Sequence, residues 1–327
     1  MNSKPRVFVT SPRIPGDAVK HLATVAEVTV FPEDRAPSQE ELIQAVQGYD
    51  GILCLLRDRL DRHVLSHAHR LRVIANYAVG YDNIDVDAAT ERGIVVTNTP
   101  DILSNATAEL AIALMFAVAR RIAEADRYVR QGRFTGWQPD LFLGMELAGA
   151  TFGVVGAGRI GTLAGLKAHA LGMRVVYWSR RRNYSLEGAT GARRMSLEDL
   201  LKTADVVSIH LPLTPETRHL IGAQQLALMK PSAILINTGR GPVIDESALI
   251  QALQKRRIRG AGLDVYEHEP QVPESLRQLD NVVLLPHIGS ATHRTREGMA
   301  QLAVENLIRV LQGKPPLTPV NPEVLQR

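Results

Sequence analysis

An arginine, two carboxylates and a histidine each follow an apolar run typical of a β-strand; they are Arg240, Glu267, Glu269 and His287. Ligands of open α/β sheets bind beyond the carboxyl ends of the strands, so we expect these side chains to converge. A guanidinium can hold the carboxylate of a 2-oxo acid or polarise its carbonyl. A histidine can donate a proton near neutral pH, and a bonded carboxylate orients it and favours its protonated form. Arg240, Glu269 and His287 are therefore candidate catalytic residues for carbonyl reduction.

Each of these residues alone has a simpler interpretation. His287 could be a hydrogen-bonded core histidine, Glu269 before Pro270 could be a solvated loop charge, and Arg240 could belong to a surface turn. All three residues follow predicted strands, and this coincidence favours the catalytic interpretation.

The segment 151–182 predicts a strand, a tight turn, a helix and a second strand at 175–178. Gly156, Gly158 and Gly161 form the pattern G-x-G-x-x-G, which allows a tight turn, close approach of a pyrophosphate and close helix–strand packing. Unpaired N–H groups at the helix N-terminus would face the phosphates. This context indicates a dinucleotide site rather than a strand-to-helix turn without a ligand.

The residues after the second strand of this segment bear on the choice of cofactor. An NAD-specific enzyme carries Asp or Glu there, bonded to the ribose hydroxyls. This chain has Ser179 followed by Arg180, Arg181 and Arg182. A hydroxyl and guanidinium groups bind a 2′-phosphate that a carboxylate would repel. The sequence therefore predicts NADPH as the preferred cofactor, with NADH possible; the alternative is a solvated basic turn.

Apolar runs and helical stretches alternate along most of the chain, which predicts an α/β protein with parallel sheets. We expect a first set of strands at 6–10, 28–31, 51–55, 72–75 and 93–97, with a helix at 39–46. A second set of six, the doubly wound number, is expected at 151–155, 174–178, 206–210, 234–237, 260–264 and 282–285.

Two further helices are expected, at 104–131 and 292–311. The first is apolar all round in its first half, which implies burial on several sides. The last lies outside the six-strand set and is expected to return to the first domain. We therefore predict a six-stranded Rossmann domain, 101–289, inserted in a discontinuous flavodoxin-like substrate domain, 1–100 plus 290–327, with the active site between them.

Composition limits the classes of function. The chain has 327 residues, 38 basic and 34 acidic, and the only tight basic cluster is 180–182, too little for a nucleic-acid surface. The longest apolar run, 110–119, is far shorter than a membrane span, and no signal peptide is evident. The single cysteine excludes an intrachain disulfide and favours a cytoplasmic location. No metal site is expected.

The chain resembles the D-isomer-specific 2-hydroxyacid dehydrogenases over nearly its whole length. The matching motifs are NYAVGYDNID (76–85), NATAELAIAL (105–114), GVVGAGRIG (153–161), HLPLTPET (210–217), MKPSAILINTGRGPVIDE (229–246), GAGLDVYEHEP (260–270) and LLPHIGSAT (284–292). NYAVGYDNID and WQPDLFLG (137–144) are most similar to the glyoxylate/hydroxypyruvate reductases of that family. The resemblance implies a homodimer built on the central helix.

The resemblance also implies roles for individual residues. Arg240 binds substrate, Glu269 is the carboxylate partner of the acid/base His287, and the backbone of Val79 and Gly80 binds the substrate carboxylate. Trp137 reaches into the neighbouring subunit's site, unless it is an ordinary packed tryptophan. The implied cofactor contacts are Thr107; Gly156, Gly158, Arg159, Ile160 and Gly161 near the pyrophosphate; Ser179, Arg180 and Arg181 at the ribose; Leu211, Pro212 and Thr217 near the adenosine; and Thr238, Gly239, Asp264, His287 and Gly289 around the nicotinamide.

The expected reaction is reduction of glyoxylate to glycolate, or of hydroxypyruvate to D-glycerate, by hydride transfer with His287 as acid/base. Another D-2-hydroxyacid dehydrogenase, of the D-lactate or D-glycerate type, is an alternative. Glu269 is evidence against a formate dehydrogenase, because those enzymes lack the glutamate partner. A nucleotide-sensing interaction protein similar to the family's corepressors is an alternative of a different class. The sequence does not rank glyoxylate, hydroxypyruvate and larger 2-oxo acids.

Overall fold

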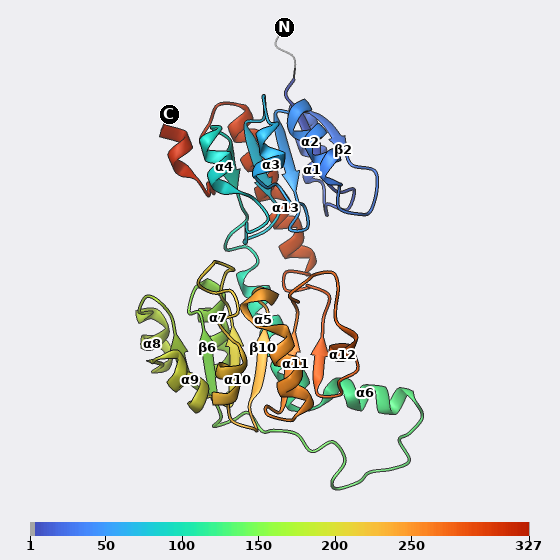
Figure 1. Cartoon of the computed structure of the whole chain (residues 1–327), viewed down its shortest axis with the longest axis vertical. Helices are drawn as coiled ribbons and strands as arrows, with labels where there is room; N and C mark the ends of the chain where they lie inside the picture. Colours follow the sequence, from blue (N-terminus) through green and yellow to red (C-terminus); the bar gives the residue numbers. More distant parts are fainter. Residues whose placement is uncertain (1–3, 327) are drawn as a thin grey trace. The chain divides into compact units, whose positions relative to one another are not determined.

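The computed structural model describes residues Lys4–Gln326, and the chain forms two compact units (Figure 1). Unit 1 comprises Met1–Leu103 and Ser290–Arg327, and unit 2 comprises Ser104–Gly289. Unit 1 is therefore discontinuous in sequence, and unit 2 is the inserted part.

Unit 1 contains a sheet of five parallel strands in the order β2-β1-β3-β4-β5. The strands are β1 (Arg6–Val9), β2 (Glu27–Val30), β3 (Gly51–Cys54), β4 (Val73–Asn76) and β5 (Val95–Thr97). This order is the flavodoxin-like one expected from the sequence. β3 and β4 are buried along their whole length, which explains why they read as continuous apolar runs.

Helices pack against this sheet and bury its apolar side chains. They are α1 (Ala18–Val25), α2 (Gln39–Gly48), α3 (Arg62–Ser66), α4 (Val86–Glu91) and α13 (His293–Leu311), with a 3-10 turn at Pro322–Gln326. The start of α2 is fixed by a capping box between Ser38 and Glu41. The Thr292 hydroxyl accepts from the Thr295 amide and caps α13, the helix expected to return to this domain.

Unit 2 contains a sheet of seven parallel strands in the order β12-β11-β10-β9-β6-β7-β8. The strands are β6 (Thr151–Val155), β7 (Arg174–Trp178), β8 (Arg193–Arg194), β9 (Val206–Ile209), β10 (Ile234–Asn237), β11 (Gly260–Leu263) and β12 (Val282–Leu284). The expected number of six is wrong, because the edge strand β8 consists of two exposed arginines that no apolar run marks. The order reverses between β6 and β9, which is where a doubly wound sheet binds its ligand.

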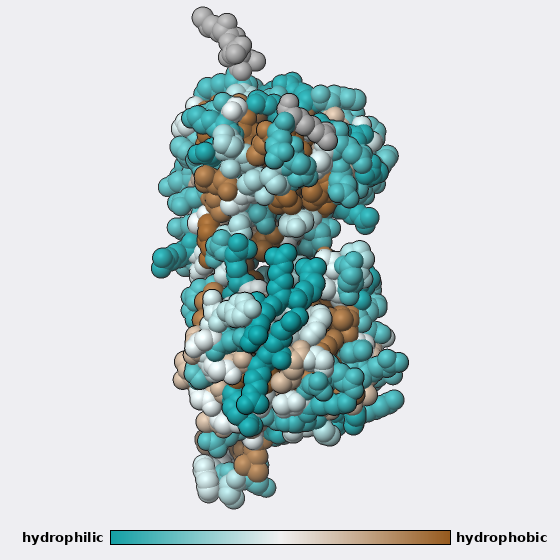
Figure 2. Space-filling view, turned by 90° about the vertical axis from the view of Figure 1, so that its left-hand side faces the viewer, coloured by the Kyte–Doolittle hydropathy of each residue, from teal (hydrophilic) through white to brown (hydrophobic). Residues whose placement is uncertain are grey.

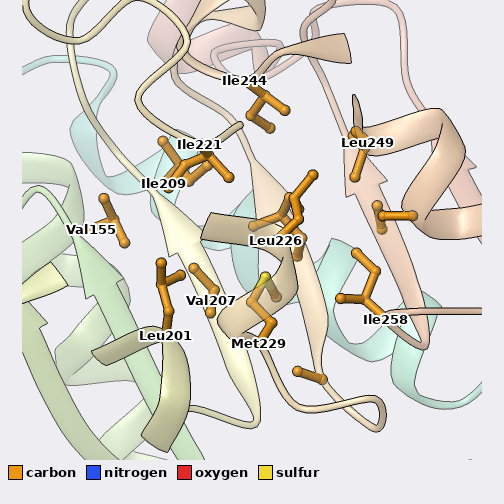
Figure 3. Packing of buried hydrophobic residues seen from close by; sticks show 14 of the residues in the cluster. Val155, Leu201, Val207, Ile209, Ile221, Leu226, Met229, Ile244, Leu249 and Ile258 are labelled. Atoms are coloured by element: carbon orange, nitrogen blue, oxygen red, sulfur yellow. The ribbon is translucent and has the colours of Figure 1, made fainter. Parts of the chain in front are cut away.

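Helices cover both faces of this sheet, so the doubly wound fold class is confirmed. They are α5 (Ser104–Ala119), α6 (Ile122–Arg130), α7 (Arg159–Ala170), α8 (Tyr184–Thr190), α9 (Leu197–Thr203), α10 (Ala223–Leu228), α11 (Glu246–Gln254) and α12 (Glu274–Arg277), with a 3-10 turn at Gly241–Val243. α5 and α7 pack on one face. Side chains from α9, α10 and α11 form the core on the other, where Leu201, Leu226 and Leu249 meet strand residues (Figure 3).

The helix expected over 104–131 is two helices, α5 and α6. Arg121 lies between them with φ of 55°, a left-handed conformation that ends a right-handed helix. The chain returns to this point, and the Met145 amide donates to the Ala119 carbonyl at 2.8 Å. The expected single helix is therefore wrong, because a distant segment supplies the hydrogen bond that lets α5 end.

α6 and the loop that follows it expose apolar side chains. No residue of α6 is buried, and Val129 and Phe134 are more than half exposed. In Figure 1 the loop after α6 extends away from the sheet of unit 2. Within Lys4–Gln326, no helix combines the length and the apolar character needed to cross a membrane.

Candidate active site

The three candidate catalytic residues follow three neighbouring strands of unit 2. β10 pairs with β11, and β11 pairs with β12, all parallel, so their carboxyl ends lie side by side. Arg240 follows β10, Glu269 lies in the loop after β11, and His287 follows β12. The register of the sheet therefore brings residues far apart in the sequence to one edge, as expected from the order of the apolar runs.

His287 and Glu269 form a direct pair. The distance between His287 Nδ1 and Glu269 Oε2 is 2.8 Å, and the Tyr266 amide donates to Glu269 Oε1 at 3.0 Å. Burial acts to raise the pKa of Glu269, but the hydrogen bond and charge of His287 outweigh it and lower that pKa. Glu269 is thus held anionic against Nδ1, which leaves Nε2 as the ring nitrogen able to reach a substrate.

The backbone at His287 is held in an unusual conformation by Asp264. His287 has φ of 55°, which non-glycine residues seldom adopt. The Asp264 carboxylate accepts from the amides of Ile288 and Gly289, both at 2.7 Å. Burial raises the pKa of Asp264, although these amides oppose the shift. Asp264, at the end of β11, therefore fixes the turn that presents His287, a role that the sequence did not indicate.

Arg240 lies in a loop that fits tightly against the segment carrying Glu269. A Cβ at Gly241 would come within 1.9 Å of the Tyr266 carbonyl, so only glycine allows this approach. Arg240 Nη1 donates to the Gly239 carbonyl at 3.1 Å, and its charge contributes to lowering the pKa of Glu269. Guanidinium, carboxylate and imidazole are therefore brought together on one edge.

The residues expected around the nicotinamide lie beside this trio. Gly289 lies close to Thr107 of α5: a Cβ atom added to Gly289 would be 3.3 Å from Thr107 Cγ2. Thr238 follows β10, and within Lys4–Gln326 its buried hydroxyl has no hydrogen-bond partner. An unsatisfied buried hydroxyl next to the reacting edge suits a ligand amide.

The glycine motif lies at the switch point of the sheet, after β6. Gly156 has φ of 98°, and a Cβ at Gly161 would be 2.1 Å from the Gly156 carbonyl oxygen, so both positions require glycine. A Cβ at Gly158 would meet nothing within 4 Å, which leaves the loop open. No side chain caps α7, which begins at Arg159 and Ile160. This cradle fits a dinucleotide pyrophosphate.

The loop after β9 lies against the same motif. A Cβ at Gly156 would be 2.7 Å from Leu211 Cδ2, and one at Gly239 would be 2.9 Å from the Leu211 carbonyl oxygen. Thr217 Oγ1 donates to the Pro212 carbonyl at 2.7 Å and so closes the loop on itself. Leu211, which is expected near the adenosine, thus lies close to both the motif and the loop after β10.

The turn after β7 presents exposed basic side chains. Ser179 is half-buried and Arg180 and Arg181 are exposed, and no hydrogen bond joins either guanidinium to another residue within Lys4–Gln326. Arg182 differs, since its Nε binds Glu187 at 2.8 Å. Figure 2 views unit 2 from the side that carries the β8 edge, where hydrophilic side chains cover much of the surface.

Two residues expected to bind the substrate carboxylate lie in unit 1. The carbonyls of Val79 and Gly80 accept from the side chains of Asn98 and Asn76, each at 2.8 Å. The amides of Val79 and Gly80 bind no acceptor among the described residues of the chain. The carbonyl groups of Val79 and Gly80 therefore hold this loop in place, and their N–H groups are left as donors for a ligand.

Trp137 is 84% exposed, in the loop after α6. Trp137 therefore does not pack against its own chain, and the alternative of a tryptophan packed in its own core is wrong.

Among the described residues, no group of three or more His, Cys, Asp and Glu side chains could hold a metal ion.

Sequence reasoning missed a second histidine–glutamate pair. His219 Nε2 and Glu267 Oε1 are 2.6 Å apart, and the Glu246 amide donates to Glu267 Oε2 at 3.1 Å. Glu267, which the sequence offered beside Glu269, therefore serves the loop at 219 rather than His287. No local pattern distinguishes the two glutamates, because the assignment depends on which loop lies nearby.

The sheet, the glycine cradle and the Arg–Glu–His edge define a dinucleotide-dependent oxidoreductase. Residues 112–289 match the model of the D-isomer specific 2-hydroxyacid dehydrogenase family, NAD binding domain. The chain is 50% identical over 326 residues to a glyoxylate reductase of Thermococcus litoralis, covering 98% of both chains. It is similar to the crystal structure of the TT0316 protein of Thermus thermophilus, with a TM-score of 0.90 and 47% identity over 96% of this chain and 99% of that one.

A second similar structure is an NADPH-dependent glyoxylate/hydroxypyruvate reductase from Sinorhizobium meliloti in complex with NADP and malonate. Its TM-score is 0.88, with 35% identity over 97% of both chains. This chain belongs to the D-isomer-specific 2-hydroxyacid dehydrogenase family. It is an oxidoreductase that uses a nicotinamide cofactor to interconvert small 2-oxo and 2-hydroxy acids.

Proposed function

We propose that this protein is an NADPH-preferring reductase that converts glyoxylate to glycolate and hydroxypyruvate to D-glycerate. The observation that carries the proposal is the 2.8 Å pair of His287 and Glu269 on the same strand edge as Arg240. The names of the relatives support the substrate class, since the Thermococcus litoralis protein is a glyoxylate reductase and the Sinorhizobium meliloti one a glyoxylate/hydroxypyruvate reductase.

The chain's own residues account for the polar part of the reaction. When bound, the reduced nicotinamide supplies a hydride to C2 of the 2-oxo acid. Arg240 holds the substrate carboxylate as a two-pronged donor. His287 Nε2 gives its proton to the carbonyl oxygen as negative charge develops there. Glu269 holds Nδ1 and stabilises the imidazolium before the proton leaves, and the product is a 2-hydroxy acid.

The other predicted contacts belong to the same proposal. We propose that the amides of Val79 and Gly80 bind the substrate carboxylate, since neither bonds an acceptor within Lys4–Gln326. The fit of Gly156, Gly158 and Gly161 to a pyrophosphate supports cofactor binding at the switch point. The buried hydroxyl of Thr238 suits the nicotinamide carboxamide.

Preference for NADPH is supported by the residues at the end of β7. No carboxylate occupies the ribose position; Ser179, Arg180 and Arg181 follow the strand instead. Two guanidiniums beside a hydroxyl bind a 2′-phosphate through charge-assisted hydrogen bonds. The same residues would accept NADH with the loss of those bonds, so NADH remains a weaker cofactor.

We further propose that the protein is a homodimer of the cytoplasm built on the central helical region, in which α6 and the exposed segment after it meet a second copy. Trp137, Phe134 and Val129 are each more than half exposed, which is costly for a monomer. Trp137 then reaches the neighbouring subunit's site, as the family resemblance implies.

Steady-state kinetics on a panel of 2-oxo acids with NADPH and NADH tests this proposal. We expect glyoxylate and hydroxypyruvate to be reduced with a higher kcat/KM for NADPH. Highest activity on pyruvate or larger 2-oxo acids would instead indicate a D-lactate-type enzyme. Binding of NADPH without turnover of any acid would contradict the proposal and indicate a nucleotide-sensing interaction protein.

A further inference from the structure

Arg194, on the edge strand β8, binds the backbone of the turn that follows β7. Its Nε and Nη2 donate to the Ser179 carbonyl at 3.1 and 2.9 Å, and Nη2 also donates to the Arg180 carbonyl at 2.9 Å. β8 pairs with β7 so that Arg194 stands opposite Tyr177, two residues before Ser179. One guanidinium thus holds two successive carbonyls of the turn.

The other end of the same turn is held by Asn183. Its amide donates to the Tyr177 hydroxyl at 2.8 Å, and its side-chain Nδ2 donates to the Ala157 carbonyl at 3.0 Å. Ala157 lies within the glycine motif, so this bond links the turn after β7 to the turn after β6. Arg182, next to Asn183, is bound to Glu187. The turn is therefore anchored on both sides.

Arg180 and Arg181 lie between these two anchors. Both side chains are exposed, and neither guanidinium bonds to another residue within the described range. The acidic group that interacts with Arg180 is Glu216, whose pKa is lowered by a hydrogen bond from Thr214 and, to a lesser degree, by the charge of Arg180. A backbone fixed in advance lowers the ordering cost of binding, because only side-chain freedom remains to be lost.

We propose that Arg194 is a positioning residue for recognition of the 2′-phosphate of NADPH. It acts through the carbonyls of Ser179 and Arg180, the two residues whose side chains contact the phosphate. Because its guanidinium binds these carbonyl oxygens, their negative ends point toward Arg194 and not toward the phosphate. This inference rests on the proposed NADPH preference. It goes beyond that preference by naming a residue outside the loop that sets it.

The neighbouring Arg193 provides a matched control. It lies on the same two-residue strand, is exposed, and carries the same charge. Successive strand residues point to opposite faces, and the Arg193 side chain bonds to no other described residue. Replacing Arg193 therefore removes a charge near the turn without removing the bonds to its carbonyls.

Binding of nucleotide fragments to the full-length protein tests this without relying on turnover. Calorimetric titration gives the Kd of adenosine 2′,5′-bisphosphate and of adenosine 5′-monophosphate for wild type, Arg194→Ala, Arg194→Lys and Arg193→Ala. We expect Arg194→Ala to weaken the bisphosphate by about tenfold and to leave the monophosphate unchanged, given the worth of charge-assisted hydrogen bonds. Arg194→Lys should weaken it by about threefold, because an ammonium cannot reproduce the fork.

The controls separate the possible failures. If wild type binds both nucleotides equally, the proposed NADPH preference fails and the inference fails with it. If wild type prefers the bisphosphate but Arg193→Ala weakens it as much as Arg194→Ala does, only net charge matters and the positioning role is wrong. Equal weakening of both nucleotides by Arg194→Ala and Arg194→Lys would indicate a merely structural residue and also overturn it.

Discussion

Two edges of unit 2 hold their functional groups in different ways. At the ends of β10, β11 and β12, the side chains of His287 and Glu269 bind each other, and the Asp264 carboxylate holds the backbone amides that follow His287. At the ends of β7 and β8, the bonds go to the backbone, and the Arg180 and Arg181 side chains stay exposed. Proton transfer needs fixed distances between side chains, whereas choice of cofactor needs only a charge on a fixed backbone.

This difference implies that chemistry and cofactor choice are separable in this chain. A change at the β10–β12 edge should alter rate and substrate binding, and one at the β7–β8 edge should alter the ratio of the two cofactors. Two results would contradict this separation. One is a lower kcat from a change in the turn after β7, and the other is a changed NADPH-to-NADH ratio from a change at Arg240, Glu269 or His287.

The largest effect is expected from His287→Ala. Loss of a positioned acid should lower kcat for glyoxylate reduction by about 10²–10⁴. The Kd of NADPH, measured by fluorescence titration, should change little. His219→Gln is a matched control, because it removes a histidine that also pairs with a glutamate, at 2.6 Å. A near-normal rate in His287→Ala would remove His287 from the role.

The next effect concerns the turn after β7. Ser179→Asp combined with Arg180→Gln and Arg181→Gln should lower the NADPH-to-NADH ratio of kcat/KM by about a hundredfold, since two charge-assisted hydrogen bonds are lost. The kcat with saturating NADH should stay near the wild-type value. An unchanged ratio would mean that the basic turn is only solvated surface.

A smaller effect is expected from Arg240→Lys. The charge is kept but the two-pronged geometry is lost, so the KM for glyoxylate should rise by about tenfold. NADPH affinity, measured in the absence of substrate, should be unaffected. A KM equal to wild type would show that the substrate carboxylate is held elsewhere.

The smallest effect should come from Glu216→Gln. The pKa of Glu216 is lowered, first by a hydrogen bond from Thr214 and then by Arg180, so it is an anion at neutral pH. Its removal should tighten NADPH binding by about twofold, the size typical of exposed charge pairs. Titration of NADPH and NADH would detect this, and weaker binding of NADPH would contradict it.

Much of the fold follows from local sequence. The apolar runs marked six of the seven strands in unit 2, and their order predicted that Arg240, Glu269 and His287 would follow neighbouring strands. The glycine motif was informative because two of its positions require glycine: Gly156 has a positive φ, and a side chain at Gly161 would collide with the Gly156 carbonyl. Such requirements act within a few residues, so they appear in the sequence.

Other features depend on pairing between distant segments and left no local signal. Arg193 and Arg194 are identical in type, and only the register of β8 against β7 determines which one reaches the Ser179 carbonyl. The end of α5 depends on Met145, far along the chain. Asp264 was expected at the nicotinamide, and its bonds to the backbone after His287 depend on the pairing of β11 with β12.

The pH dependence of single-turnover glyoxylate reduction, compared between wild type and Glu269→Gln, tests the central claim most directly. The pKa of Glu269 is lowered, so its carboxylate is anionic throughout the neutral range and is lost only as pH falls through that lowered pKa. The wild-type rate should therefore fall at the acid end, because Nδ1 then loses its anionic partner. Glu269→Gln has no carboxylate to protonate, so its rate should be lower at neutral pH and should lack this fall at the acid end. An unmoved profile would contradict the account, because the pair would then play no part in proton donation.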